Sequence, residues 1–270
     1  MIRNNLLKTV KLPYKEVKGS FELRQQKAGQ FTHKVMKNLS SQVKNGVSLS
    51  KFARGFKKVL PENISVFVKK NKDKESYAQL NRVYTEDNYI VKQVLELNTN
   101  EQNKINNLHI PTITHEVRHL ADSLYHPKII SREQIVAKKG LDSDKLTKFY
   151  DENIYVREMG YTNKMKKKII KDIGHDIKKV LRGLKTEDKI DVLQNMRYNL
   201  ISERNAFKEE NKIAKKLYNK KQDVYEDTLE NSSKEYMFDE KIQLFKKMIY
   251  ELIKRERGIN KAKLENNISC

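Results

Sequence analysis

The spacing of apolar residues divides the chain into two long helical regions on either side of a short region with strand-like alternation. Before residue 60, apolar side chains recur three or four positions apart, which predicts helices, most clearly at Leu49–Val59. Between 63 and 98 the period falls to two, as in Ile64, Val66 and Val68. This region predicts two or three antiparallel strands, with a turn at 86–88 between the last two.

Helical spacing returns after this region and continues almost to the end of the chain. It predicts helices at about 144–159, 162–183, 187–221 and 234–257. The expected fold class is therefore α+β, with helical flanks around a small sheet. The expected segments are a basic helical N-terminal segment at 1–60, a central domain at 61–161, a basic helical region at 162–258 and a tail at 259–270.

The net charge indicates which partners the chain can bind, and the cysteine content limits which disulfides and metal sites it can form. The 270 residues carry a formal net charge of +21, which favours an anionic partner for the basic helices, either nucleic acid or an acidic protein. The alternative is that these lysines form an ordinary solvated face. Cys270 is the one cysteine, which excludes an intramolecular disulfide and disfavours a cysteine-based zinc site.

No transmembrane stretch and no Sec signal peptide is apparent in the sequence. A protein with these features is expected in the cytoplasm, or it is delivered without a Sec signal, as an effector or a virion-associated protein. A membrane location is not expected.

The strongest chemical signal is the stretch His115-Glu116-x-x-His119. On an α-helix, residues four apart lie on one face, about 40° apart, so both imidazoles can reach one metal ion. Glu116 can then meet a water molecule at that metal as a general base. We expect a helix here, with Thr112 or Thr114 as its cap. The alternative is a solvated helix with two surface histidines.

This motif resembles the zincin metallopeptidases, and Asp122, three residues after the second histidine, extends the resemblance to the gluzincin type. The chain looks most like lethal-factor-like toxin proteases and small phage or effector zinc peptidases. That group usually has glycine where this chain has Arg118. A metzincin is disfavoured because Tyr125 stands at the position of the third ligand. The resemblance implies a zincin-like domain whose small sheet precedes the motif helix and whose edge strand holds the substrate backbone.

The resemblance also implies a third ligand, a glutamate on a later helix. Three residues are candidates, and we favour Glu152, which on a helix would share an inward face with Phe149. Glu203 is the main alternative, because it stands on an apolar helical face, and Glu158 is a further one. Asp122 is expected to fix the orientation of an imidazole from outside the ligand shell.

The function expected from these residues is a zinc-dependent endopeptidase, with Zn²⁺ held by His115, His119 and Glu152 or Glu203. Glu116 would move the proton in hydrolysis of a peptide or protein substrate. The alternative is a non-enzymatic protein that binds nucleic acid or forms part of a virion or scaffold and keeps a degenerate zincin module.

Overall fold

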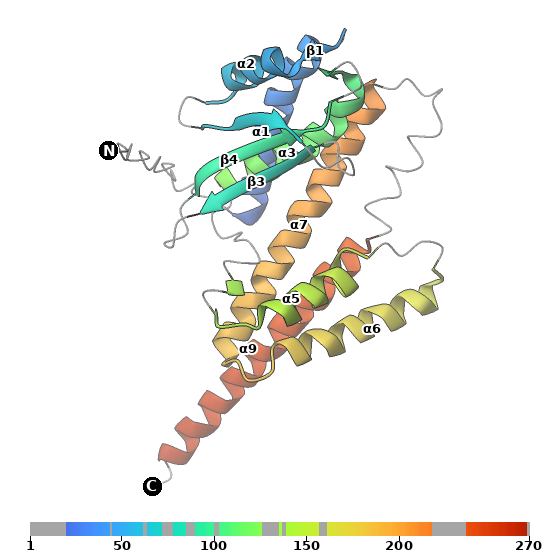
Figure 1. Ribbon diagram of the computed structural model, residues 1–270. Coiled ribbons are helices and arrows are strands. Elements are labelled where there is room, and N and C mark those ends of the chain that lie inside the picture. Colours follow the sequence, from blue (N-terminus) through green and yellow to red (C-terminus); the bar gives the residue numbers. More distant parts are fainter. Residues whose placement is uncertain are drawn as a thin grey trace, which may run out of the picture. The chain divides into compact units, whose positions relative to one another are not determined.

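The computed structural model describes most of the chain, and its elements are drawn in Figure 1. Residues 85–89, 126–134 and 157–160 lie outside the description, and with them the expected turn at 86–88 and Glu158. The side chains of 82–92 and 259–268 are also not described. The described residues are 20–43, 45–61, 64–71, 78–84, 90–99, 103–125, 135–136, 139–156, 161–217 and 236–268.

The fold is α+β, mainly helical with small sheets, which confirms the expected class. Contacts divide the chain into two compact units. Unit 1 contains the described residues of Met1–Pro127 and Ala206–Glu226, and unit 2 those of Lys128–Asn205 and Asp227–Cys270. This division differs from the segments expected from the sequence, because the N-terminal helices pack with the motif helix and one long helix contributes to both units.

The sheet of unit 1 has three strands: β2 (Phe67–Lys70), β3 (Ala78–Tyr84) and β4 (Ile90–Leu97). Their order is β2-β4-β3, so β3 is an edge strand of the described sheet. β3 and β4 pair antiparallel, whereas β2 and β4 pair in parallel. The expected antiparallel pairing is confirmed for β3 and β4, whereas the expectation that the third strand is also antiparallel was wrong. β2 lies on the side of β4 away from β3 and runs in the same direction as β4.

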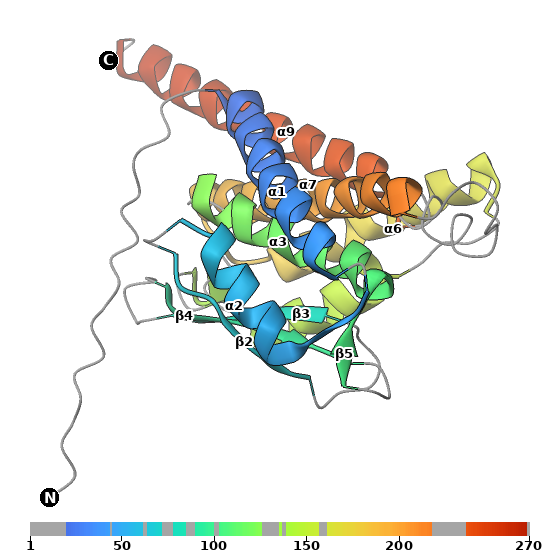
Figure 2. The same ribbon diagram turned by 90° about the horizontal axis from the view of Figure 1, so that it is seen from above.

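The motif helix packs against this sheet, and a second helix packs on the motif helix. The motif helix α3 (Ile110–Tyr125) lies between the sheet and α1 (Phe21–Val43), as the view from above shows (Figure 2). The expected helical spacing is confirmed in α1, where Val35, Met36 and Leu39 are buried. The helix expected at Leu49–Val59 is confirmed as α2, and Ser48 caps it by accepting a hydrogen bond from the backbone N–H of Lys51.

A second, two-stranded sheet of unit 1 joins β1 (Val47–Ser48) to β5 (Lys104–Ile105) in antiparallel register. Ile105 is fully buried in the main core of the unit. This pairing fixes the chain just before it enters the motif helix. The helix therefore starts from an anchored strand.

Unit 2 is helical in its described part. It contains α5 (Ser143–Phe149), a π-helical turn η2 (Tyr150–Ile154), α6 (Asn163–Val180), the first part of α7 (Thr186–Leu217) and α9 (Phe238–Ile268). The helix expected to end near 257 thus continues into the segment expected as a tail. Gly140 has a φ of 59°, a left-handed conformation that is common just after the end of a helix. Among the helices that the structure describes, none has both the length and the apolar composition needed to cross a bilayer.

Candidate metal centre

The motif helix α3 is held in place by its apolar side, on which Ile113, Val117 and Leu120 are buried in the core of unit 1. A 3-10 turn, η1 (Asn107–His109), precedes it, and the Asn106 side chain accepts from the backbone N–H of Leu108 at 3.1 Å. Asn106 thus caps the turn that leads into α3. The expectation of Thr112 or Thr114 as the helix cap was wrong, because α3 begins at Ile110, before both threonines.

The two motif histidines turn the same ring nitrogen toward each other. The Nε2 atoms of His115 and His119 lie 3.1 Å apart, and the rings meet edge to face. The pair is largely shielded from solvent; the His115 side chain is 12% exposed. The four-residue spacing therefore places both imidazoles on one face of α3, as the sequence predicted.

Helix α7 supplies a carboxylate to the other side of His115. The Nδ1 atom of His115 lies 3.0 Å from Oε2 of the buried Glu210, and Phe207 packs edge-on against the imidazole at 4.7 Å between centroids. A carboxylate accepts and does not donate, so Nδ1 carries the proton. In the neutral ring Nε2 is then left with a lone pair that faces His119.

Glu203 completes a group of potential ligands with the two histidines. One ligand atom from each of these residues lies within 4.8 Å of the others. The division into two units falls inside α7, just after Asn205, but the helix is unbroken there, and Glu203 stands one turn before Phe207. Glu203, Phe207 and Glu210 therefore share one face of α7, at positions i, i+4 and i+7.

The donor set suits zinc. Zinc takes imidazole nitrogen and carboxylate oxygen at roughly 2 Å, so two nitrogens in its tetrahedral shell lie about 3.4 Å apart. The observed separation of 3.1 Å between the Nε2 atoms is close to this value. The proton on Nδ1 toward Glu210 leaves Nε2 of His115 as the nitrogen that could bind a metal, and carboxylates orient ligating histidines in this way in zinc proteins.

Glu116 connects the motif helix to the edge strand. Its Oε2 atom accepts a hydrogen bond from the backbone N–H of Leu80, in β3, at 2.9 Å. A hydrogen bond from an N–H group favours the ionised carboxylate, which is the form that a general base needs. This hydrogen bond also places α3 next to the outer edge of β3. The histidine-bearing face of the helix therefore lies beside that edge.

The favoured third ligand, Glu152, has a different local environment from the one expected. It lies in the π-helical turn, and its side chain is 59% exposed and lies 3.7 Å from Lys148. The expectation of an inward face was wrong, because the wider turn, closed by the bond from the Tyr155 N–H to the Tyr150 carbonyl, shifts the residues off 3.6-residue periodicity. The structure instead gathers the alternative, Glu203, with the histidines.

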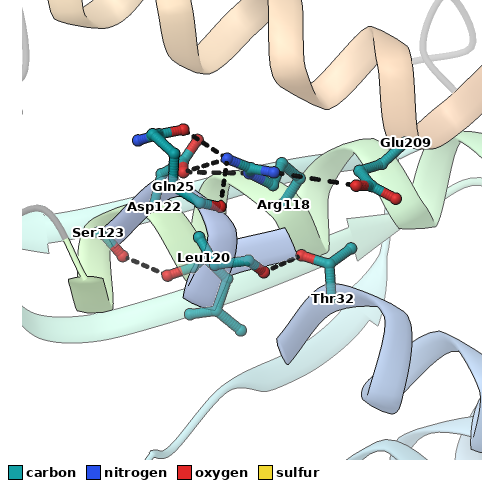
Figure 3. A network of polar contacts seen from close by, with 8 residues as sticks. Gln25, Thr32, Arg118, Leu120, Asp122, Ser123 and Glu209 are labelled. Atoms are coloured by element: carbon teal, nitrogen blue, oxygen red, sulfur yellow. Dashed lines mark hydrogen bonds and ion pairs between the residues drawn. The ribbon is translucent and has the colours of Figure 1, made fainter. Parts of the chain in front are cut away.

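Asp122, expected beside an imidazole, is buried next to Arg118. The Nε and Nη2 atoms of Arg118 both lie 3.0 Å from Oδ1 of Asp122. Figure 3 shows the Arg118 side chain between Asp122, Gln25 of α1 and Glu209 of α7. Arg118 is 4% exposed, so its charge is compensated inside the protein, and it links three helices behind the histidines.

Sequence reasoning missed Glu210 and the role of Arg118. Glu210 lies seven residues after Glu203, on the same helical face, and this spacing is the signal that could have found it. For Arg118 the signal was Asp122 four residues later, a spacing at which opposite charges pair on a helix. Neither signal identifies the partner helix, because that depends on tertiary packing.

Comparisons of this chain with protein-family models, curated proteins and solved structures found no match.

Proposed function

We propose that this protein is a zinc-dependent endopeptidase, with His115, His119 and Glu203 as zinc ligands and Glu116 as general base. The observation that carries the proposal is the pair of Nε2 atoms at 3.1 Å, with Glu203 grouped beside them. Glu210, on Nδ1 of His115, supports it, because this contact selects the tautomer that a metal requires.

The protein groups have separate tasks in this proposal. When bound, zinc supplies a Lewis acid that polarises the scissile carbonyl and lowers the pKa of water. Glu210 holds the His115 ring in orientation through Nδ1. Glu116 takes a proton from the attacking water onto its carboxylate and delivers it to the leaving amine nitrogen as the C–N bond breaks.

The outer edge of β3 suits an extended peptide as substrate. In the described sheet β3 pairs with β4 on one side, and on the other the N–H of Leu80 points to Glu116. Backbone groups that point outward recur every second residue along such a strand, and they can pair with the backbone of an added peptide. A peptide bound there would run beside the carboxylate that moves the proton.

Cleavage of a mixed peptide library by the purified protein, followed by mass spectrometry, tests this function. We expect internal cleavage that stops when 1,10-phenanthroline removes zinc and returns when zinc is added back. A library left uncut by zinc-loaded protein, or cutting that persists after the chelator has removed the metal, would overturn the proposal.

A further inference from the structure

Helix α6 carries a row of cationic side chains that the proposed peptidase site does not use. Seven of its 18 residues are lysine, against two aspartates. At about 100° per residue, five of its basic positions fall within roughly 80° of one another. These residues are all exposed, and together we call them the basic face: Lys164, Lys168, Lys171, His175 and Lys178.

The charge of the basic face is not cancelled within the helix. Asp172 and Asp176 lie beyond one edge of the face, and Asp176 lies 2.8 Å from Lys179, outside the face. None of the four lysines of the basic face forms an ion pair with a residue in the part of the chain that the structure describes. The row therefore presents a single sign of charge to solvent.

The opposite side of α6 is already used for packing. Ile173 and Ile177 are buried, and Gly174 brings α6 close to Leu244 of α9, within unit 2. A helix that lies in a membrane surface inserts its apolar side between lipids. Because the apolar side of α6 is buried in protein, a lipid surface is not the partner that this helix fits.

The basic face also lacks the anchors of a protein interface. Protein partners gain most of their binding energy from buried aromatic and apolar side chains, and the five members of the face are lysine and histidine. Nucleic acid presents about one phosphate per 3.4 Å of helix axis on each strand, and lysines that neutralise phosphates release counterions. The row from Lys164 to Lys178 is roughly 21 Å long at 1.5 Å per residue, about six base pairs of duplex.

We propose that the basic face of α6 binds the phosphate backbone of duplex nucleic acid. Its lysines act as point charges on phosphates, so binding depends on salt and not on base sequence. The protein thereby has a nucleic-acid-binding surface in addition to its proposed peptidase site.

Fluorescence anisotropy with the full chain and a labelled 30-base-pair duplex tests this inference. The test variant replaces Lys164, Lys168, Lys171 and Lys178 with Gln. The control variant makes the same change at four exposed cations of α2: Lys51, Arg54, Lys57 and Lys58. Both variants lower the formal net charge from +21 to +17, so they differ in where the charge is lost and not in how much.

We expect the parent protein to bind the duplex with an affinity that falls steeply as salt rises. The α6 variant should lose at least ~10²-fold in affinity at 0.1 M salt, and the slope of log K against log salt should become shallower by about 3.6, or about 0.9 for each lysine that contacts a phosphate. The α2 variant should lose less than about fivefold. Unchanged helical content by circular dichroism should show that both variants fold, since all eight side chains are exposed.

Three results would overturn the inference. The first is absence of duplex binding by the parent at 50 mM salt. The second is an equal loss in both variants, which would assign the attraction to net charge alone. The third is stronger binding, dependent on the same four lysines, to phosphatidylserine vesicles or to poly-glutamate than to the duplex, which would assign the face to a lipid surface or an acidic protein.

Discussion

Replacing Glu116 with Gln is expected to lower peptide hydrolysis by at least ~10²-fold, the usual contribution of a positioned acid–base group. Glutamine has the size of glutamate, and its carbonyl oxygen can still accept the hydrogen bond from the Leu80 N–H. The fold and the bound zinc should therefore be retained while the proton acceptor is lost. The measurement is the initial rate on a peptide selected from the library, with zinc content determined for the same sample.

Glu96→Gln is a suitable control for this experiment. Glu96 lies on β4 in the same unit and pairs with Lys69 at the surface, at 2.8 Å. Its loss removes one carboxylate without touching the proposed site, so the rate should stay within about twofold, as expected for a weak surface ion pair. If Glu116→Gln cleaves as fast as Glu96→Gln, Glu116 does not move the proton.

Replacing Glu203 with Ala is expected to weaken zinc binding by more than ~10²-fold, because it removes a ligand and leaves two imidazoles to hold the metal. Glu210→Ala, which removes the partner of His115 Nδ1, should cost roughly 10–100-fold. Glu152→Ala should bind zinc like the parent, since its side chain is exposed beside Lys148. Titration against a competing chelator measures all three affinities.

The opposite ranking would change the ligand assignment. If Glu152→Ala loses zinc and Glu203→Ala does not, the third ligand comes from the π-helical turn, as first expected from the sequence. Glu158→Ala belongs in the same series, because Glu158 lies outside the described residues. Loss of zinc in that variant alone would likewise remove Glu203 from the site.

The sequence predicted local structure best where one short segment contains the signals that start and end a helix together with the apolar periodicity of that helix. The bounds of α2 follow from a serine cap, an apolar face with Phe52 and Phe56, and Pro61 two residues after its end. The common face of His115 and His119 follows from helix geometry alone. These features need no knowledge of the rest of the chain.

The direction of β2 and the identity of the third ligand depend on tertiary packing. Neither could be predicted from a local sequence pattern. Alternation at Ile64, Val66 and Val68 indicates an extended segment, but it does not say which strand lies beside it or in which direction. The expected orientation of Glu152 assumed a regular helix, and the π-helical turn changed it. Glu210 lies 95 residues from His115 in the sequence. A local sequence pattern cannot predict a contact between residues so far apart.

The most direct test of the proposed metal centre is the zinc content of the purified chain, prepared without chelators and measured by inductively coupled plasma mass spectrometry. We expect close to one zinc ion per chain in the parent. We expect that zinc to be lost in a variant with both His115 and His119 replaced by Ala. A parent protein without stoichiometric zinc, or a double variant that retains as much zinc as the parent, would show that these histidines do not form a zinc site.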